Sequence, residues 1–211
     1  MITFKGILHM YPEPSLVNEG YITVSESPKH TLYWQEYGSP SGKPVMILHG
    51  GPGSGAMKDQ ASLFDPTFYR IIMFDQRGAG KSTPHASLEA NTTSHLIDDI
   101  NMLRANLNVS GKMHLFGGSW GSTLALAYAI QHPDNIASIT LYGVFLGREA
   151  DITDFYQSNA TTLNDQQTAG EAQKELANEW HRYVTFIPES ERSDMIEAYR
   201  RRLHSEDKTE Q

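Results

Sequence analysis

The sequence has no cysteine among its 211 residues, which excludes disulfides and thiolate metal or redox sites. Basic residues are few: 17 Lys and Arg stand against 25 Asp and Glu, for a net charge of −8. Without a basic cluster, such a chain is a poor ligand for nucleic acid or an anionic membrane surface. No apolar run is long enough to span a bilayer, and the first residues lack the pattern of a secretory signal peptide. These absences favour a reducing compartment, and we expect a cytoplasmic protein.

The residues that are present suit a folded domain. The chain is 39% hydrophobic and 20% charged, which is enough apolar material for a core. It contains no internal repeat and no low-complexity tract. The length fits one domain, or one domain with part of a second.

Short apolar runs alternate with helical patterns before residue 147. The runs predict strands at residues 20–25, 31–37, 45–48, 69–74, 113–116 and 136–145. Only a short turn separates the first two, so we expect them to be antiparallel. The run at 45–48 is wholly apolar and fits a strand of a buried parallel sheet, and the later runs are similar. Helices are expected over residues 96–107, with an N-cap among residues 91–94, and over residues 120–132. The polar face of the first helix is expected to hold Asp98, Asp99, Asn101 and Arg104.

This order of elements predicts an α/β fold, in which helices flank a mostly parallel sheet. After Gly147 the pattern is helical only. Apolar stripes predict one helix with Leu176, Trp180, Tyr183, Val184 and Ile187, and another with Met195, Ile196, Tyr199 and Leu203. We therefore expect a sheet core over residues 1–147 and a partial helical cap over residues 148–211.

A G-x-S-x-G pattern lies between an expected strand and an expected helix. It consists of Gly117, Gly118, Ser119, Trp120 and Gly121. This is the setting of a nucleophile elbow, in which the serine occupies a strained turn and the glycines avoid clashes with the strand and the helix. The N–H of Trp120, at the start of the helix, would face the reacting carbonyl. On its own, so short a pattern is more often an ordinary glycine-rich turn with a solvated serine.

A second motif supports the first. His49, Gly50, Gly51, Pro52 and Gly53 follow an apolar strand. In an HGGG-type loop of this kind a backbone N–H completes the oxyanion hole, and Gly51 is the candidate donor. The glycines let the backbone approach a substrate oxygen, and Pro52 stiffens the turn. The alternative is an ordinary strand-to-helix turn.

A third segment, residues 75–82 (DQRGAGKS), also directly follows an expected strand. We interpret it as structural, with Asp75 and Arg77 paired to one another and bracing the oxyanion loop. All three segments lie at the carboxyl ends of strands, where ligands bind in open α/β sheets. Their combination predicts an α/β-hydrolase fold with Ser119 as the nucleophile.

Longer segments resemble the proline iminopeptidase (prolyl aminopeptidase) family. They are HGGPGSG at 49–55, FDQRGAGKSTPHASLEANTT at 74–93 and FGGSWGSTLALAYA at 116–129, with shorter matches at 154–157, 186–192 and 198–203. General esterases do not share the part STPHASLEANTT. The resemblance covers nearly the whole chain. It implies hydrolysis of N-terminal proline from a peptide through a prolyl-enzyme on Ser119, with no metal and no other cofactor. The peptide substrate is the expected partner, and the oligomeric state stays open.

The sequence offers no candidate for the acid and the base of a Ser–acid–His triad. In this fold both residues follow later strands. His132, His181 and His204 come after Ser119, but they lie at a helix end, on a polar helix face and in a polar tail. By resemblance, the acid and the base lie beyond residue 211, and the final strands of the sheet are absent. The chain then resembles the N-terminal portion of an iminopeptidase, whose activity on its own stays open.

Two positions depart from the family pattern. Ala79 stands where the family often has Cys, a change that we expect to be neutral. Tyr142 stands where the family has Arg, which leaves the strict preference for proline open. The alternatives are therefore an α/β-hydrolase esterase or a broader aminopeptidase and, from another class, a catalytically inert product that only binds or associates.

Overall fold

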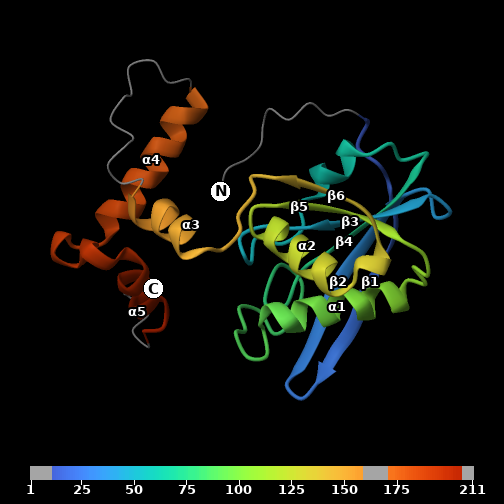
Figure 1. Ribbon diagram of the computed structural model, residues 1–211, viewed down its shortest axis with the longest axis horizontal. Coiled ribbons are helices and arrows are strands. Elements are labelled where there is room, and N and C mark those ends of the chain that lie inside the picture. The colour runs from blue at the N-terminus through green and yellow to red at the C-terminus, as the bar shows by residue number, and fades with distance from the viewer. Residues whose placement is uncertain (1–10, 159–170, 206–211) are drawn as a thin grey trace. The chain divides into compact units, whose positions relative to one another are not determined.

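The computed structural model describes residues 11–158 and 171–205 (Figure 1). Contacts divide the chain into two compact units, and the boundary lies between Leu146 and Gly147. We name residues 11–146 the core unit and the described residues from Gly147 onward the second unit. No described helix is both long and apolar enough to cross a membrane.

The core unit is built on one six-stranded sheet with the strand order β1-β2-β4-β3-β5-β6. β3 is parallel to β4 and β5, and β5 is parallel to β6, whereas β2 is antiparallel to both β1 and β4. The strands are β1 (Leu16–Glu26), β2 (Lys29–Gly38), β3 (Lys43–Leu48), β4 (Tyr69–Phe74), β5 (Met113–Gly118) and β6 (Ile136–Tyr142). The predicted strands and the antiparallel first pair are confirmed, except that the last strand ends at Tyr142 instead of residue 145. The sheet is mixed and mostly parallel.

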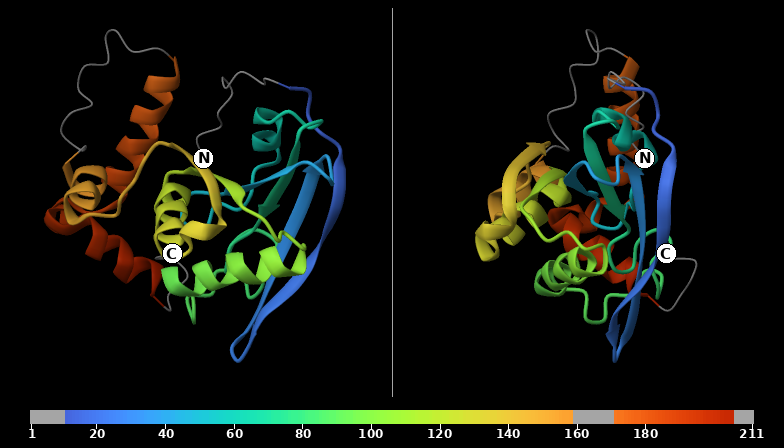
Figure 2. Two further views of the ribbon diagram at one scale, coloured as in Figure 1. Left: turned by 45° about the vertical axis from the view of Figure 1, so that its right-hand side comes forward. Right: turned by 90° about the vertical axis from the view of Figure 1, so that its right-hand side faces the viewer.

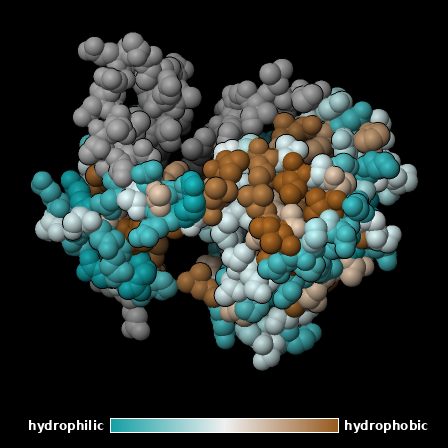
Figure 3. Space-filling model, viewed as in Figure 1, coloured by the Kyte–Doolittle hydropathy of each residue, from teal (hydrophilic) through white to brown (hydrophobic). Residues whose placement is uncertain are grey.

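β1 and β2 form a long hairpin that extends past the other strands (Figure 2). Only the last part of β2, from Trp34 to Gly38, pairs with β4. At the opposite edge of the sheet, β6 pairs with β5 alone among the described strands. Figure 3 shows apolar residues gathered over β6 on the face in view.

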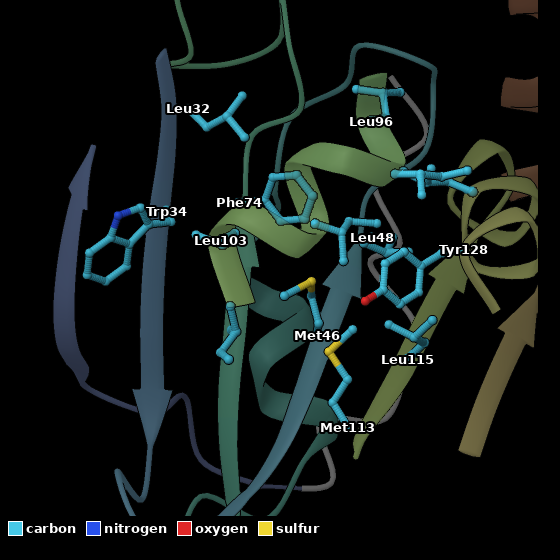
Figure 4. Packing of buried hydrophobic residues seen from close by; sticks show 14 of the residues in the cluster. Leu32, Trp34, Met46, Leu48, Phe74, Leu96, Leu103, Met113, Leu115 and Tyr128 are labelled. Atoms are coloured by element: carbon cyan, nitrogen blue, oxygen red, sulfur yellow. The ribbon is translucent and has the colours of Figure 1, made fainter. Parts of the chain in front are cut away.

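Alternation along the strands divides the hydrophobic core between the two faces of the sheet. Met46 and Leu48 of β3 are buried in the larger cluster, which Figure 4 shows between the strands and helix α1. Val45 and Ile47 belong to the other cluster, with Ala61 of a short 3₁₀ helix. Because both faces are covered, residues 45–48 of the strand are all apolar instead of alternating between apolar and polar residues.

The larger cluster is covered by α1 (Thr93–Asn106) and α2 (Trp120–Gln131). Thr92, from the predicted group of caps, is the N-cap residue of α1. Short 3₁₀ helices occupy Lys58–Leu63 and Pro133–Asn135. The predicted polar face of α1 is wrong for Asp99 and Arg104, which are buried. Both side chains find hydrogen-bond partners inside the protein, which offset the cost of burying their charges.

The second unit is helical in its described residues. It contains α3 (Glu149–Thr153), a π-helical turn (Asp154–Ser158), α4 (Glu171–Phe186), a 3₁₀ helix (Glu189–Asp194) and α5 (Met195–Leu203). Its small core contains Ile187, Met195 and Ala198. The predicted stripe on α5 is wrong for Ile196 and Leu203, which are exposed. The side chain of Leu176 lies outside the described residues.

Candidate active site

The three predicted segments meet at the carboxyl ends of the parallel strands. β3, β4 and β5 are parallel neighbours, so their carboxyl ends lie side by side. The loop with His49 follows β3, the segment that begins at Asp75 follows β4, and Ser119 follows β5. Three segments that are distant in the sequence therefore lie together at the carboxyl ends of these strands.

Ser119 stands between the last residue of β5 and the first residue of α2. Its φ is 52° and its ψ is −123°, a backbone conformation that residues other than glycine rarely adopt. The turn is held by hydrogen bonds: the Ser119 N–H donates to the Tyr142 carbonyl at 3.1 Å, and the Ser122 hydroxyl donates to the Ser119 carbonyl at 2.6 Å. The side chain of Ser119 is exposed. The strained, outward-facing turn predicted from the motif is present.

The glycines of the motif have no room for a side chain. A Cβ on Gly117 would lie 2.3 Å from the Gly121 carbonyl oxygen, and a Cβ on Gly121 would lie 2.0 Å from the Leu48 carbonyl oxygen. A Cβ on Gly118 would lie 2.0 Å from the Tyr142 ring. Backbone oxygens cannot move away as a flexible side chain can. The tight passage from β5 to α2 therefore requires glycine.

The loop after β3 lies against this turn. A Cβ on Gly50 would be 3.2 Å from Cβ of Ser119, so only a glycine backbone passes here without displacing its neighbour. Gly51 and Gly53 have φ values of 114° and 101°, in the region that favours glycine. Ser54 closes the loop through its hydroxyl, which donates to the Gly50 carbonyl at 2.9 Å. The loop is thus a tight backbone turn beside the serine.

His49 anchors the loop after β3 through both of its ring nitrogens. Its Nδ1 lies 2.9 Å from the Gly50 carbonyl oxygen, and its Nε2 lies 2.9 Å from the Gln76 backbone nitrogen. Since the carbonyl only accepts and the backbone N–H only donates, the imidazole is neutral with its proton on Nδ1. Burial lowers the pKa of His49, which favours the same neutral form.

Gln76 connects the loop after β3 to Trp120 at the start of α2, a role that was not predicted from the sequence. Its side-chain Nε2 donates to the His49 carbonyl at 2.9 Å, and its Oε1 accepts from Trp120 Nε1 at 2.9 Å. The side chain is almost fully buried. The one signal in the sequence was a polar amide placed directly after a buried strand and an aspartate.

The predicted pairing of Asp75 with Arg77 is wrong. Arg77 makes a buried bidentate pair with Asp99 of α1, with both N–O distances at 2.7 Å. The carboxylate of Asp75 accepts instead from the backbone N–H groups of Ala56 and Lys81, each at 2.7 Å. Arg77 therefore reaches Asp99 of α1, while the Asp75 carboxylate is occupied by these two backbone donors. Burial raises the pKa of Asp99, and Arg77 opposes that rise.

Tyr142 lies beneath the serine turn at the end of β6. Its ring covers Gly118 and contacts Phe116, with ring centroids 5.1 Å apart. Its hydroxyl accepts a hydrogen bond from Gln60 Nε2 at 2.7 Å, and burial raises the pKa of the phenol. Tyr142 therefore supports the turn with both its side chain and its backbone carbonyl.

Histidines of the core unit have partners away from Ser119. His132 at the end of α2 contacts Asn101, His114 contacts Ser138, and His30 contacts the Glu89 carbonyl. His181 and His204 belong to the second unit. In residues 11–158 and 171–205, no histidine shares a hydrogen bond with the Ser119 hydroxyl. Within the same residues, no group of three or more His, Asp or Glu side chains could hold a metal ion.

The chain has curated relatives with a shared name. It is 45% identical over 206 residues to the proline iminopeptidase of Arabidopsis thaliana, an alignment that covers 97% of this chain and 50% of that protein. It is 46% identical over 198 residues to the proline iminopeptidase of Xylella fastidiosa, covering 94% of this chain and 58% of that one. The chain thus spans between half and three fifths of the length of these relatives.

Solved structures and a family comparison agree on the fold. VinJ superposes with a TM-score of 0.57 over 89% of this chain and 62% of its own, at 21% identity. A proline iminopeptidase-related protein from Thermus thermophilus superposes with a TM-score of 0.50 over 59% of this chain and 43% of its own, at 30% identity. Residues 43–204 match the model of the alpha/beta hydrolase fold family. The chain therefore belongs to the alpha/beta hydrolase fold family.

Proposed function

We propose that this chain carries the nucleophile and the oxyanion hole of a serine aminopeptidase that removes proline from the N-terminus of peptides. The observation that carries the proposal is the exposed Ser119, held at a φ of 52° between β5 and α2 with the Gly50 backbone against it. The names of the relatives supply the substrate class, a peptide with an N-terminal proline. The expected compartment is the cytoplasm.

The proposed reaction follows from the position of these groups. The Ser119 hydroxyl oxygen attacks the prolyl carbonyl, its proton passes to a base, and the base returns that proton to the departing amine. A prolyl-enzyme remains, and water then releases proline and restores the serine. The N–H groups of Gly51 and Trp120 hold the oxyanion in both steps, and each such donor contributes roughly 3–4 kcal/mol in enzymes where it was removed.

A base and an acid are needed because a serine at its ordinary pKa is a weak nucleophile. We place both in the part of the protein that residues 1–211 do not include. The occupied histidines of the core unit support this assignment, as does the greater length of the relatives. In the same proposal, residues 148–211 begin a helical cap.

The test is an assay of the protein expressed from its natural gene. It should hydrolyse proline 4-nitroanilide faster than 4-nitrophenyl acetate, and Ser119→Ala should lower kcat by about a millionfold. Ser110→Ala, an exposed serine on the same unit, should leave the rate unchanged. Preference for the aryl ester would favour an esterase.

A fluorophosphonate probe separates an enzyme from an inert protein. Labelling that Ser119→Ala abolishes would identify the nucleophile without any assumption about the substrate. Absence of labelling and of both hydrolytic activities in the natural protein would establish the inert alternative.

A further inference from the structure

One buried side chain touches both of the loops that carry the proposed oxyanion donors. Gln76 donates from Nε2 to the His49 carbonyl and accepts at Oε1 from the Trp120 indole N–H. Its own backbone N–H donates to Nε2 of the same histidine. All three bonds have a length of 2.9 Å.

These hydrogen bonds involve residues at or next to the two proposed oxyanion donors. The His49 carbonyl belongs to the residue before Gly50, and the Gly50 carbonyl in turn accepts from the His49 ring. Gly51, the proposed first donor, comes next in the chain. The proposed second donor is the backbone N–H of Trp120, whose side chain is the one that Gln76 holds. The Gln76 amide is therefore a direct link between the segments that carry the two donors.

An oxyanion hole depends on the separation of its donors. The donors act because they are already aimed at the position where the charge develops, so no reorganisation is needed during the reaction. A shift of about 1 Å in a positioning group can cost on the order of 100-fold in rate. A rigid link between the loops fixes this separation better than two loops anchored independently.

We infer that Gln76 is a positioning residue that sets the separation of the Gly51 and Trp120 N–H groups. This inference rests on the proposed function. An amide is suited to the place, because it must donate toward His49 and accept from Trp120 at the same time. A glutamate can only accept when ionised, and a methionine of similar length makes neither hydrogen bond.

The inference is tested in the natural protein with Gln76→Met, Gln76→Glu and the exposed Gln131→Met as the matched control. We expect Gln76→Met to lower kcat by about 10- to 100-fold, with KM within about twofold, because substrate binding does not use the link. Gln76→Glu should also lower kcat, since it keeps the acceptor for Trp120 but sets a second acceptor against the His49 carbonyl oxygen. Gln131→Met should match the parent protein.

Trp120→Phe provides a second route if Gln76→Met does not fold. It breaks one side of the link and leaves both Gln76–His49 bonds in place. If the link acts through the indole, this variant lowers kcat, and the double variant Trp120→Phe with Gln76→Glu is no slower than the slower single variant. Additive losses in kcat would overturn the inference, as would an unchanged kcat in Gln76→Met.

A readout without catalysis keeps the inference separate from the proposed function. The Trp120 indole proton should exchange slowly with solvent in the parent protein and at least about tenfold faster in Gln76→Met, because its acceptor is gone. If Ser119→Ala retains full activity, the proposed function fails, whereas the exchange measurement still decides whether Gln76 holds the indole. Equal exchange in both proteins would overturn the inference alone.

Discussion

The two units of the chain use their charged side chains in different ways. In the core unit, the side chains of Arg77 and Asp99 pair at 3% and 0% exposure. In the second unit, the side chains of Arg200 and Glu197 pair one helical turn apart at 60% and 43% exposure. Both pairs have an N–O distance of 2.7 Å, so bond length does not distinguish them.

Burial gives the two pairs different consequences. A charge in the interior of the core unit has lost its water and depends on its partner, so its geometry is tightly determined. A charge on the surface of α5 exchanges its partner for water at little cost. The loops around Ser119 are likewise positioned by buried polar contacts, those of the neutral side chains of His49 and Gln76. The comparison teaches that a buried pair such as Arg77–Asp99 specifies geometry, whereas an exposed pair such as Arg200–Glu197 adds little to it.

The largest effect on folding is expected when Gly121 of the core unit is given a side chain. Gly121→Val should prevent the core unit from folding, since even its Cβ would lie 2.0 Å from the Leu48 carbonyl oxygen. Gly111→Val is the matched control, because a Cβ there meets no atom within 4 Å. Circular dichroism during heating checks both. A cooperative transition in Gly121→Val at the parent temperature would contradict the prediction.

The next effect concerns the buried ion pair. Asp99→Asn removes the negative partner of a guanidinium that stays buried, and we expect a loss of about 3–5 kcal/mol in the free energy of unfolding. Asp98→Asn, on the exposed side of the same helix, should change it by less than about 0.5 kcal/mol. Urea unfolding of the two variants gives the comparison, and equal losses would show that burial does not control this pair.

A smaller effect is expected from pH at His49. Its pKa in the folded protein lies below the ordinary 6.5 because burial disfavours the charged ring. Acid therefore favours the unfolded chain, whose imidazole takes up a proton near pH 6.5. Above that pH the contribution of His49 to stability is complete, and between that pH and its lower pKa in the folded protein it falls by up to about 1.4 kcal/mol per pH unit.

Urea unfolding at several pH values between 5 and 8 measures this slope. His49→Gln should reduce the dependence of the unfolding free energy on pH below pH 6.5. His181→Gln, at an exposed position, should leave more of that dependence intact. A slope that is the same in the parent protein and in His49→Gln would rule out a neutral His49 as its source.

The smallest effect is expected in the second unit. Glu197→Gln removes an exposed partner of Arg200, and the stability of the protein should not change measurably. Thermal unfolding in low and high salt checks this, since screening should have no more effect than the substitution. A clear loss of stability would mean that surface charges matter in the second unit, and the contrast with Asp99 would no longer hold.

Local patterns predicted much of the fold and part of the candidate site. The apolar run of β3 and the turn at Ser119 depend on residues that are neighbours in the sequence, and both are present as expected. The partners of Arg77 and Asp75 could not be predicted in that way. Arg77 reaches across to α1, 22 residues later, and Asp75 binds backbone groups that carry no sequence signal. A polar residue on a helix looks exposed until its buried partner is known, as Asp99 shows.

The sequence by itself determined the order of strands and helices, the glycines of the two turns and the place of Ser119. The physical reason is that periodic burial and backbone sterics act over a few residues. The tertiary structure alone decided that Gln76 joins the His49 loop to Trp120, and that Arg77 pairs with Asp99. Such contacts form because parallel strands bring their carboxyl ends together, so that each buried polar group is left to find a partner from another part of the chain.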